Sequence, residues 1–114
     1  MGLQISLRHA ADVVVVDLQG KATIGRANDA LNKQLRQLID DGTDKILVNL
    51  TDVTQLDSSS ISTIVRAFVS LQHRGASLNL LRPRGTVKLV LETLRLLDAI
   101  PSAEDEAQAI ASFR

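Results

Sequence analysis

Residues 45–72 read KILVNLTDVTQLDSSSISTIVRAFVSLQ and contain a strand pattern, a polar turn and a helix pattern in that order. Residues 45–50 are mostly apolar and include the β-branched residues typical of a central strand. Residues 51–56 are predicted to be the loop after it. From Ile61 to Gln72 apolar residues recur at helical spacing, and Gly75 marks the end of that helix. The DSSS run at 57–60 therefore lies where a strand leads into a helix.

Toward the N-terminus, the same reasoning predicts two strands and a helix. Apolar residues alternate with polar ones over 3–7, and four consecutive valines in 12–18 suit a strand covered on both faces. The roughly four residues between these strands favour an antiparallel hairpin. Gly20 and Gly25 are predicted to bracket a short loop, before a helical pattern over 27–39 that ends near Gly42.

Toward the C-terminus, the pattern predicts a strand at 78–81, a helix over 87–94 and a final helix over 107–111 capped by residues 102–105. A short edge strand is expected at 99–102. Alternating strands and helices favour an α/β sandwich, with a mixed sheet of four to five strands and about four helices packed mainly on one face. Binding sites in such sheets lie beyond the carboxyl ends of strands, where the DSSS run is expected.

Composition limits the classes of function. The 114 residues are 45% apolar and 23% charged, as expected for one domain over 1–114. Thirteen basic and thirteen acidic residues give no broad field for nucleic acid. With no Cys and two His, a thiolate or His-rich metal centre is excluded, and no metal or cofactor is expected. No apolar run approaches the ~18 residues of a membrane span, so we expect no membrane insertion and a cytoplasmic location.

The DSSS run allows two interpretations. Asp and Ser are common N-cap residues, so capping alone explains such a cluster. A hydroxyl at a helix N-terminus also suits a phosphate, because it faces unpaired N–H groups and the positive end of the helix dipole. Catalysis is not expected, since no nucleophile has a matching base and the glycines lack the Lys and Ser/Thr of a phosphate-binding loop.

The order of elements, together with Leu47-Val48-Asn49-Leu50 leading to Leu56-Asp57-Ser58-Ser59, resembles the STAS domain family over about residues 3–113. Within it, the chain is similar to small bacterial anti-sigma factor antagonists. The resemblance implies a STAS-like sandwich that binds an anti-sigma factor with serine kinase activity. It also implies that Ser58 accepts phosphate, which releases the partner and makes the chain a phosphoprotein that regulates transcription. A serine phosphatase is a further candidate partner.

This chain departs from the family pattern at two supporting positions. Ser60 replaces a glycine that is usual in the family, so Ser59 and Ser60 are alternative phosphate acceptors. Thr23 stands where many members carry Asp. Asp57 and Thr23 are expected to support the phosphorylation site. An alternative role is a STAS-type accessory subunit of a membrane transport complex, which docks on an ATPase without phosphorylation. The residues expected to form the docking face are Ala22, Thr23, Ile24, Gly25, Ser59, Ser60 and Ser62.

Overall fold

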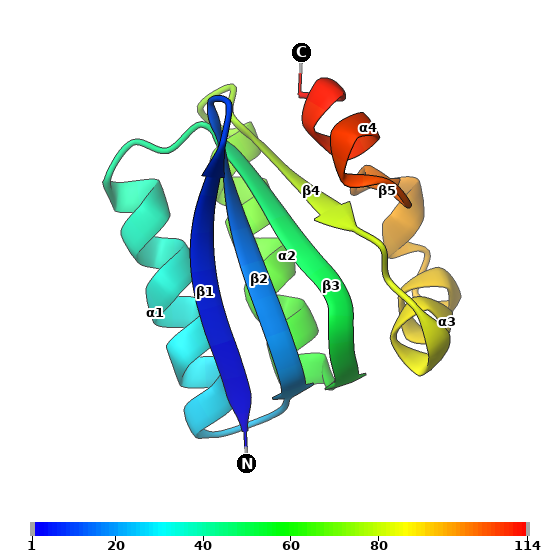
Figure 1. Cartoon of the computed structure of the whole chain (residues 1–114). Helices are drawn as coiled ribbons and strands as arrows, with labels where there is room; N and C mark the ends of the chain where they lie inside the picture. Colours follow the sequence, from blue (N-terminus) through cyan, green and yellow to red (C-terminus); the bar gives the residue numbers. More distant parts are fainter. Residues whose placement is uncertain (1, 114) are drawn as a thin grey trace.

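A computed structural model describes residues 2–113 (Figure 1). The strands pair in the order β1-β2-β3-β4-β5, and a 3₁₀ turn, Leu96–Asp98, follows the third helix. The elements in chain order are β1 (Leu3–Ala10), β2 (Val13–Ala22), α1 (Arg26–Asp40), β3 (Lys45–Leu56), α2 (Ser58–Gln72), β4 (Ser77–Leu81), α3 (Gly85–Thr93), β5 (Ser102–Ala103) and α4 (Glu106–Ala111).

The sheet is mixed, as the sequence predicts. β1 and β2 form an antiparallel hairpin whose turn is Ala11 and Asp12, while β2, β3, β4 and β5 are parallel neighbours. Each parallel connection contains a helix, since parallel strands need a crossover. These crossovers bring the carboxyl ends of β2 and β3 to the same edge of the sheet, beside the start of α2.

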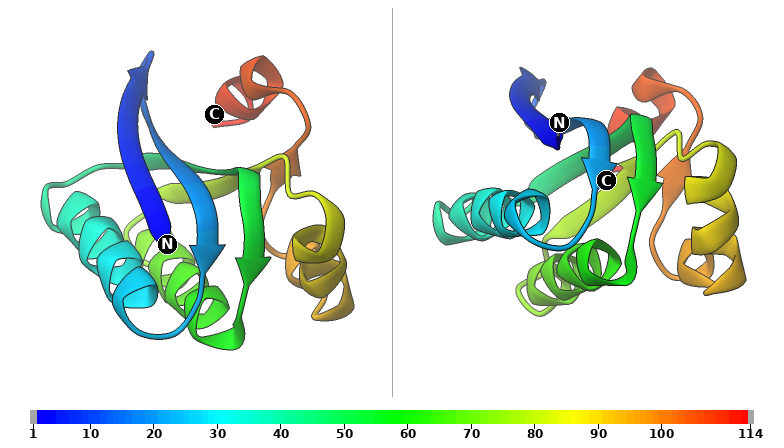
Figure 2. Two further views of the ribbon diagram at one scale, coloured as in Figure 1. Left: turned by 60° about the horizontal axis from the view of Figure 1, so that its bottom comes forward. Right: turned by 90° about the horizontal axis from the view of Figure 1, so that it is seen from below.

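The consecutive valines of β2 are buried on both faces of the sheet. Val14 and Val16 face the larger apolar cluster, which α1, α2 and α3 cover. Val13 and Val15 face a smaller cluster on the other side, which Phe113 and Ala109 of the C-terminal segment cover. Figure 2 shows α1 and α2 beneath the sheet and α4 on the opposite side. The helices are thus mainly on one face, with α4 as the exception.

Two strands are longer than the sequence predicts. Residues 51–56 were expected to be a loop but form the second half of β3, and β2 continues past 18 to Ala22. The pairing of β2 with β3 shifts register twice, and at each shift β3 accommodates one extra residue. Because each shift interrupts the period-2 alternation, Val53 and Leu56 are both buried although they lie three residues apart. Gly20 consequently lies inside β2, not in a loop.

The C-terminal elements are also displaced from the prediction. The short edge strand is at Ser102–Ala103, not 99–102, and it pairs with β4. The last helix spans Glu106–Ala111 and is capped by Asp105, whose side chain accepts a hydrogen bond from Gln108 N–H. In the part of the chain described, no helix has the length and apolar character needed to cross a membrane.

Candidate phosphorylation and partner-binding site

Asp57 caps the N-terminus of α2. It has an extended backbone (φ −92°, ψ 177°), and its Oδ1 accepts hydrogen bonds from Ser60 N–H at 3.1 Å and from Ser59 Oγ at 2.7 Å. Both bonds satisfy or order groups at a helix end that have no partner within the helix. The capping interpretation of the DSSS run is confirmed, and the hydroxyl that Asp57 orients belongs to Ser59.

The same carboxylate connects α2 to the loop between β2 and α1. Asp57 Oδ2 accepts a hydrogen bond from Ile24 N–H at 2.7 Å, and Asp57 N–H donates to Ala22 O at 3.1 Å. The Ser59 hydroxyl, followed by the N–H groups of Ser60 and Ile24, stabilises the charged carboxylate and lowers the pKa of Asp57. One ionised side chain therefore fixes both segments of the expected docking face.

The three candidate acceptor serines differ in accessibility. Ser58 is exposed, and it is the first residue of α2. Ser59 is half-buried, with its hydroxyl donated to Asp57. Ser60 is fully buried at 0% exposure, and its Oγ has no hydrogen-bond partner among residues 2–113. A kinase must enclose the attacking hydroxyl, so the geometry favours Ser58 over the two alternatives.

The residues expected to form the docking face also differ in accessibility. Ala22 is buried in the larger core and Thr23 is half-buried. Ile24 is 78% exposed, an unusual state for a large apolar side chain, and Gly25 next to it has a positive φ of 98°. Ser62 is exposed one turn after Ser58. The accessible part of the expected docking face, with the neighbouring Ser58, therefore consists of Ile24, Gly25, Ser58, Ser62 and the exposed part of Ser59, and we refer to it as the Ile24–Ser58 surface.

Two supporting residues were not identified from the sequence. Thr63 on α2 is 1% exposed and lies within hydrogen-bond distance of Asn28 Oδ1 on α1, at 2.7 Å, while Asn28 N–H donates to Thr23 O at 3.0 Å. These contacts hold Thr23, the residue before Ile24, against the first turn of α1 and so connect the Ile24 loop to α2 a second time. A signal was available, because Thr63 is a polar residue on the mostly apolar buried face of α2, but its partner Asn28 is 35 residues away.

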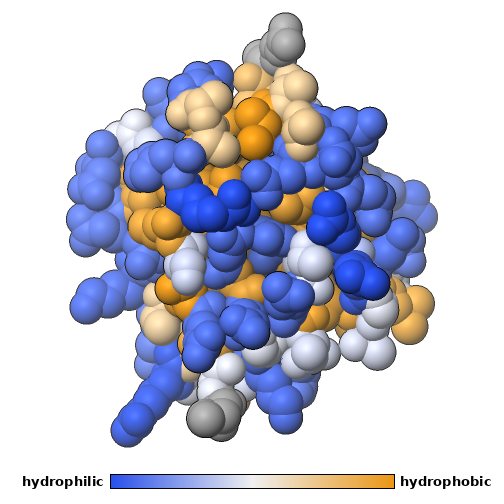
Figure 3. Space-filling view, viewed as in Figure 1, coloured by the Kyte–Doolittle hydropathy of each residue, from blue (hydrophilic) through white to orange (hydrophobic). Residues whose placement is uncertain are grey.

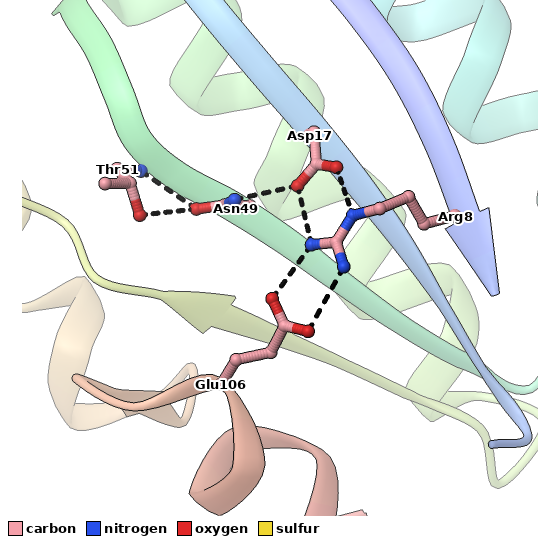
Figure 4. Close-up of polar contacts among 5 residues, drawn as sticks. All are labelled: Arg8, Asp17, Asn49, Thr51 and Glu106. Carbon is pink, nitrogen blue, oxygen red and sulfur yellow. Dashed lines mark hydrogen bonds and ion pairs between the residues drawn. The ribbon is translucent and has the colours of Figure 1, made fainter. Parts of the chain in front are cut away.

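A second polar cluster lies on the opposite face of the sheet (Figure 4). The Arg8 guanidinium is bound by Asp17 and by Glu106, with Nη2 at 3.0 Å from Asp17 Oδ1 and 2.8 Å from Glu106 Oε1. Asn49 donates to the same Asp17 and accepts from Thr51. Figure 3 shows mostly hydrophilic side chains across this face. The sequence pattern gave no sign of the ion pair between Arg8 and Glu106, which lie 98 residues apart.

This cluster lacks the features of a ligand site. Beside it is an open hollow of about 320 Å³, lined almost entirely by polar side chains. The Arg8 guanidinium is already bound by two carboxylates, so these three groups are engaged with one another. Its hydrogen bonds hold the pKa of Asp17 and the pKa of Glu106 below their ordinary values. Among residues 2–113, no group of three or more His, Cys, Asp or Glu side chains is placed to bind a metal. The Ile24–Ser58 surface remains the candidate site.

Comparison with solved structures gives several matches along nearly the whole chain. An anti-sigma factor antagonist from Mycobacterium paratuberculosis has a TM-score of 0.86 at 16% identity, covering 99% of this chain and 95% of its own. SpoIIAA is described as an anti-sigma factor antagonist and matches in its unphosphorylated form, with a TM-score of 0.75 at 17% identity and 96% coverage of both chains. The phosphorylated SpoIIAA of Bacillus matches with a TM-score of 0.76 at 22% identity, covering 97% and 100%.

These likenesses show a shared fold, and the sequence itself carries a family signature. No curated protein sequence matches the chain. The model of the STAS domain matches residues 4–109, a range that runs from the second residue of β1 into α4. The prediction of the family from the DSSS run and the order of elements is confirmed. The chain belongs to the STAS domain family and has the fold of its anti-sigma factor antagonists.

Proposed function

We propose that the protein is a non-catalytic anti-sigma factor antagonist whose binding is controlled by phosphorylation of Ser58. The observation that carries the proposal is an exposed serine at the first position of α2, the helix whose N-terminus Asp57 connects to the loop of the exposed Ile24. In support, the structural neighbour SpoIIAA has been solved in phosphorylated and unphosphorylated forms. The partner is an anti-sigma factor with serine kinase activity. It binds ATP and performs the phosphoryl transfer.

The proposed switch is electrostatic. A phosphoserine carries about −1.5 to −2 charges. The fold tolerates this charge at Ser58, because the side chain is exposed and the N-terminus of α2 favours a nearby anion. A partner that covers the Ile24–Ser58 surface must desolvate the phosphate and place it against the ionised Asp57. The modification therefore leaves the monomer folded and opposes the complex.

The test is to incubate the protein with ATP and the kinase encoded beside it, and to map the phosphate by mass spectrometry. We expect phosphate on Ser58, none on Ser58→Ala, and unchanged labelling of Ser62→Ala, which is a matched exposed serine on the same helix. Absence of phosphate from Ser58 together with absence of binding contradicts the proposal. Binding to a transport ATPase without modification at 58–60 supports the alternative role as a transport subunit.

A further inference from the structure

The free edge of β1 is a second surface available for association. β1 spans eight residues, Leu3–Ala10, and pairs with β2 on one side only. Its pairing with β2 runs without a register shift, and the strand contains no proline and no lysine. Proteins usually protect a long edge strand with such residues or with a bulge, because its unpaired N–H and C=O groups accept another strand. This edge lacks those protections.

The one arginine in the strand does not protect the edge either. Arg8 extends from β1 across the sheet toward Asp17 and Glu106, as Figure 4 shows. Its charge is therefore neutralised and directed away from the free side of β1. An approaching strand meets no unpaired cation at this position.

The hydrogen-bond phase of the hairpin shows which backbone groups are free. Lys21 N–H donates to Gly2 O at 3.4 Å, which places Gly2 and Lys21 in a hydrogen-bonded pair of the antiparallel ladder. Because such pairs alternate, even-numbered residues of β1 bond toward β2 and odd-numbered residues direct N–H and C=O to the free edge. The outward-facing residues are thus Leu3, Ile5 and Leu7, followed by His9.

The side chains of Leu3, Ile5 and Leu7 form an apolar stripe that α1 covers incompletely. Leu3 and Ile5 pack partly against the larger core, while Leu7 is 40% exposed. A hollow of about 320 Å³ remains between Ile5 and α1, lined by Ala30, Lys33, Gln34 and Gln37. The stripe and the free backbone groups therefore lie along the same edge.

We propose that β1 is an interface between two copies of this chain, paired antiparallel about a two-fold axis at Ile5. In this register Ile5 lies opposite Ile5 of the second copy, and Leu3 lies opposite Leu7 in both directions. In all three pairs the backbone N–H and C=O groups hydrogen-bond across the interface. The apolar side chains of the same pairs pack against each other. The two sheets become one continuous sheet. The interface is separate from Ser58 and does not depend on the proposed phosphorylation.

The first test measures the mass of the purified protein across a concentration series by sedimentation or light scattering. We expect a reversible dimer. Leu7→Lys places two cations against the opposite Leu3 side chains and should weaken the dimer at least tenfold, whereas Leu89→Lys, at an exposed leucine of α3, should not. Circular dichroism verifies that both variants are folded.

The second test fixes the register. The chain has no cysteine, so Ile5→Cys introduces a unique thiol. Opposed residues of a hydrogen-bonded pair have Cα atoms about 5.5 Å apart, within the range of a disulfide. We expect oxidation to produce a covalent dimer of Ile5→Cys and not of Leu89→Cys.

Two results overturn the proposal. A dissociation constant of about 1 mM corresponds to only about 4 kcal/mol, so a protein that remains monomeric up to that concentration lacks this interface. An edge that accepts only a strand of a different protein gives the same monomeric result. A dimer that persists in Leu7→Lys, without cross-linking at position 5, is formed by another surface.

Discussion

Asp57 is the residue that turns a common helix cap into a connector between two segments. Its two oxygens accept hydrogen bonds from Ser59, Ser60 and Ile24, so the carboxylate binds α2 to the loop after β2. An asparagine at this position would retain one acceptor oxygen and lose the charge that strengthens all three bonds. The exposed Ile24 and Ser58 are thus positioned by a group that need not touch the partner.

The buried Ser60 hydroxyl predicts a stabilising substitution. Ser60 is 0% exposed and its Oγ finds no partner in the described part of the chain, so Ser60→Ala removes an unsatisfied polar group and should stabilise the fold by about 1 kcal/mol. Ser59→Ala is the matched control, since its hydroxyl donates to Asp57, and it should cost about 0.5–1 kcal/mol. Urea denaturation measures the free energy of unfolding of both variants. Destabilisation by Ser60→Ala would show that the hydroxyl is satisfied in solution.

Gly20 predicts a destabilising substitution. It has φ 107° inside β2, and an added Cβ would overlap Gly2 O. Gly20→Ala should therefore cost about 2–4 kcal/mol. Gly42→Ala also has a positive φ, 85°, but its Cβ would meet nothing within 4 Å, so it should cost only about 1 kcal/mol. Equal losses in thermal or urea unfolding would contradict the overlap.

At the scale of elements, the loop between β2 and α1 presents a single large apolar side chain. Ile24 is 78% exposed, so Ile24→Ala should leave stability nearly unchanged. If the partner buries this side chain, the substitution should weaken binding about tenfold or more. Leu89→Ala is the control, at a leucine that is 61% exposed on α3. Calorimetric titration that gives equal affinities for wild type and Ile24→Ala would exclude Ile24 from the interface.

α4 is a short helix fastened to the sheet by Phe113, Ala109 and the Arg8–Glu106 pair. Arg8 lowers the pKa of Glu106, so the pair stabilises the fold above the unfolded pKa and is lost as pH falls through the folded one. A double-mutant cycle with Arg8→Gln and Glu106→Gln should give about 0.5–1 kcal/mol at neutral pH, because both groups are partly exposed and screened.

The control for that cycle is the same measurement in acid and in salt. The coupling should fall toward zero once Glu106 is protonated, and it should shrink in about 1 M salt. A coupling that is unchanged in acid would mean that contacts other than the ion pair fasten α4.

The elements differ in how far the sequence could predict them. α1 and α2 were predicted nearly to their ends, because each carries one apolar stripe of helical period over fifteen residues. The second half of β3 was missed, since two register shifts against β2 disrupt its alternation. The Arg8–Glu106 pair joins residues 98 positions apart, and no local sequence pattern predicts such a contact.

At the scale of the whole molecule, the two faces of the sheet have different roles. One face of the sheet buries the larger core beneath α1, α2 and α3. The Ile24–Ser58 surface lies at the edge of this sheet where β2 and β3 end. The other face is largely hydrophilic apart from the small cluster beneath α4. The fold class and the position of the DSSS run at the end of a strand were predictable. Which serine is exposed depends on how deeply α2 is seated, which spacing alone does not determine.

The central claim is that one added charge at Ser58 decides whether the partner binds. The direct test is to titrate the anti-sigma factor kinase, by calorimetry, with unmodified protein and with protein phosphorylated quantitatively at Ser58. We predict that phosphorylation weakens binding at least a hundredfold, about 2.7 kcal/mol, while the circular dichroism spectrum stays the same. Equal affinity of the two forms, with both folded, would contradict the account.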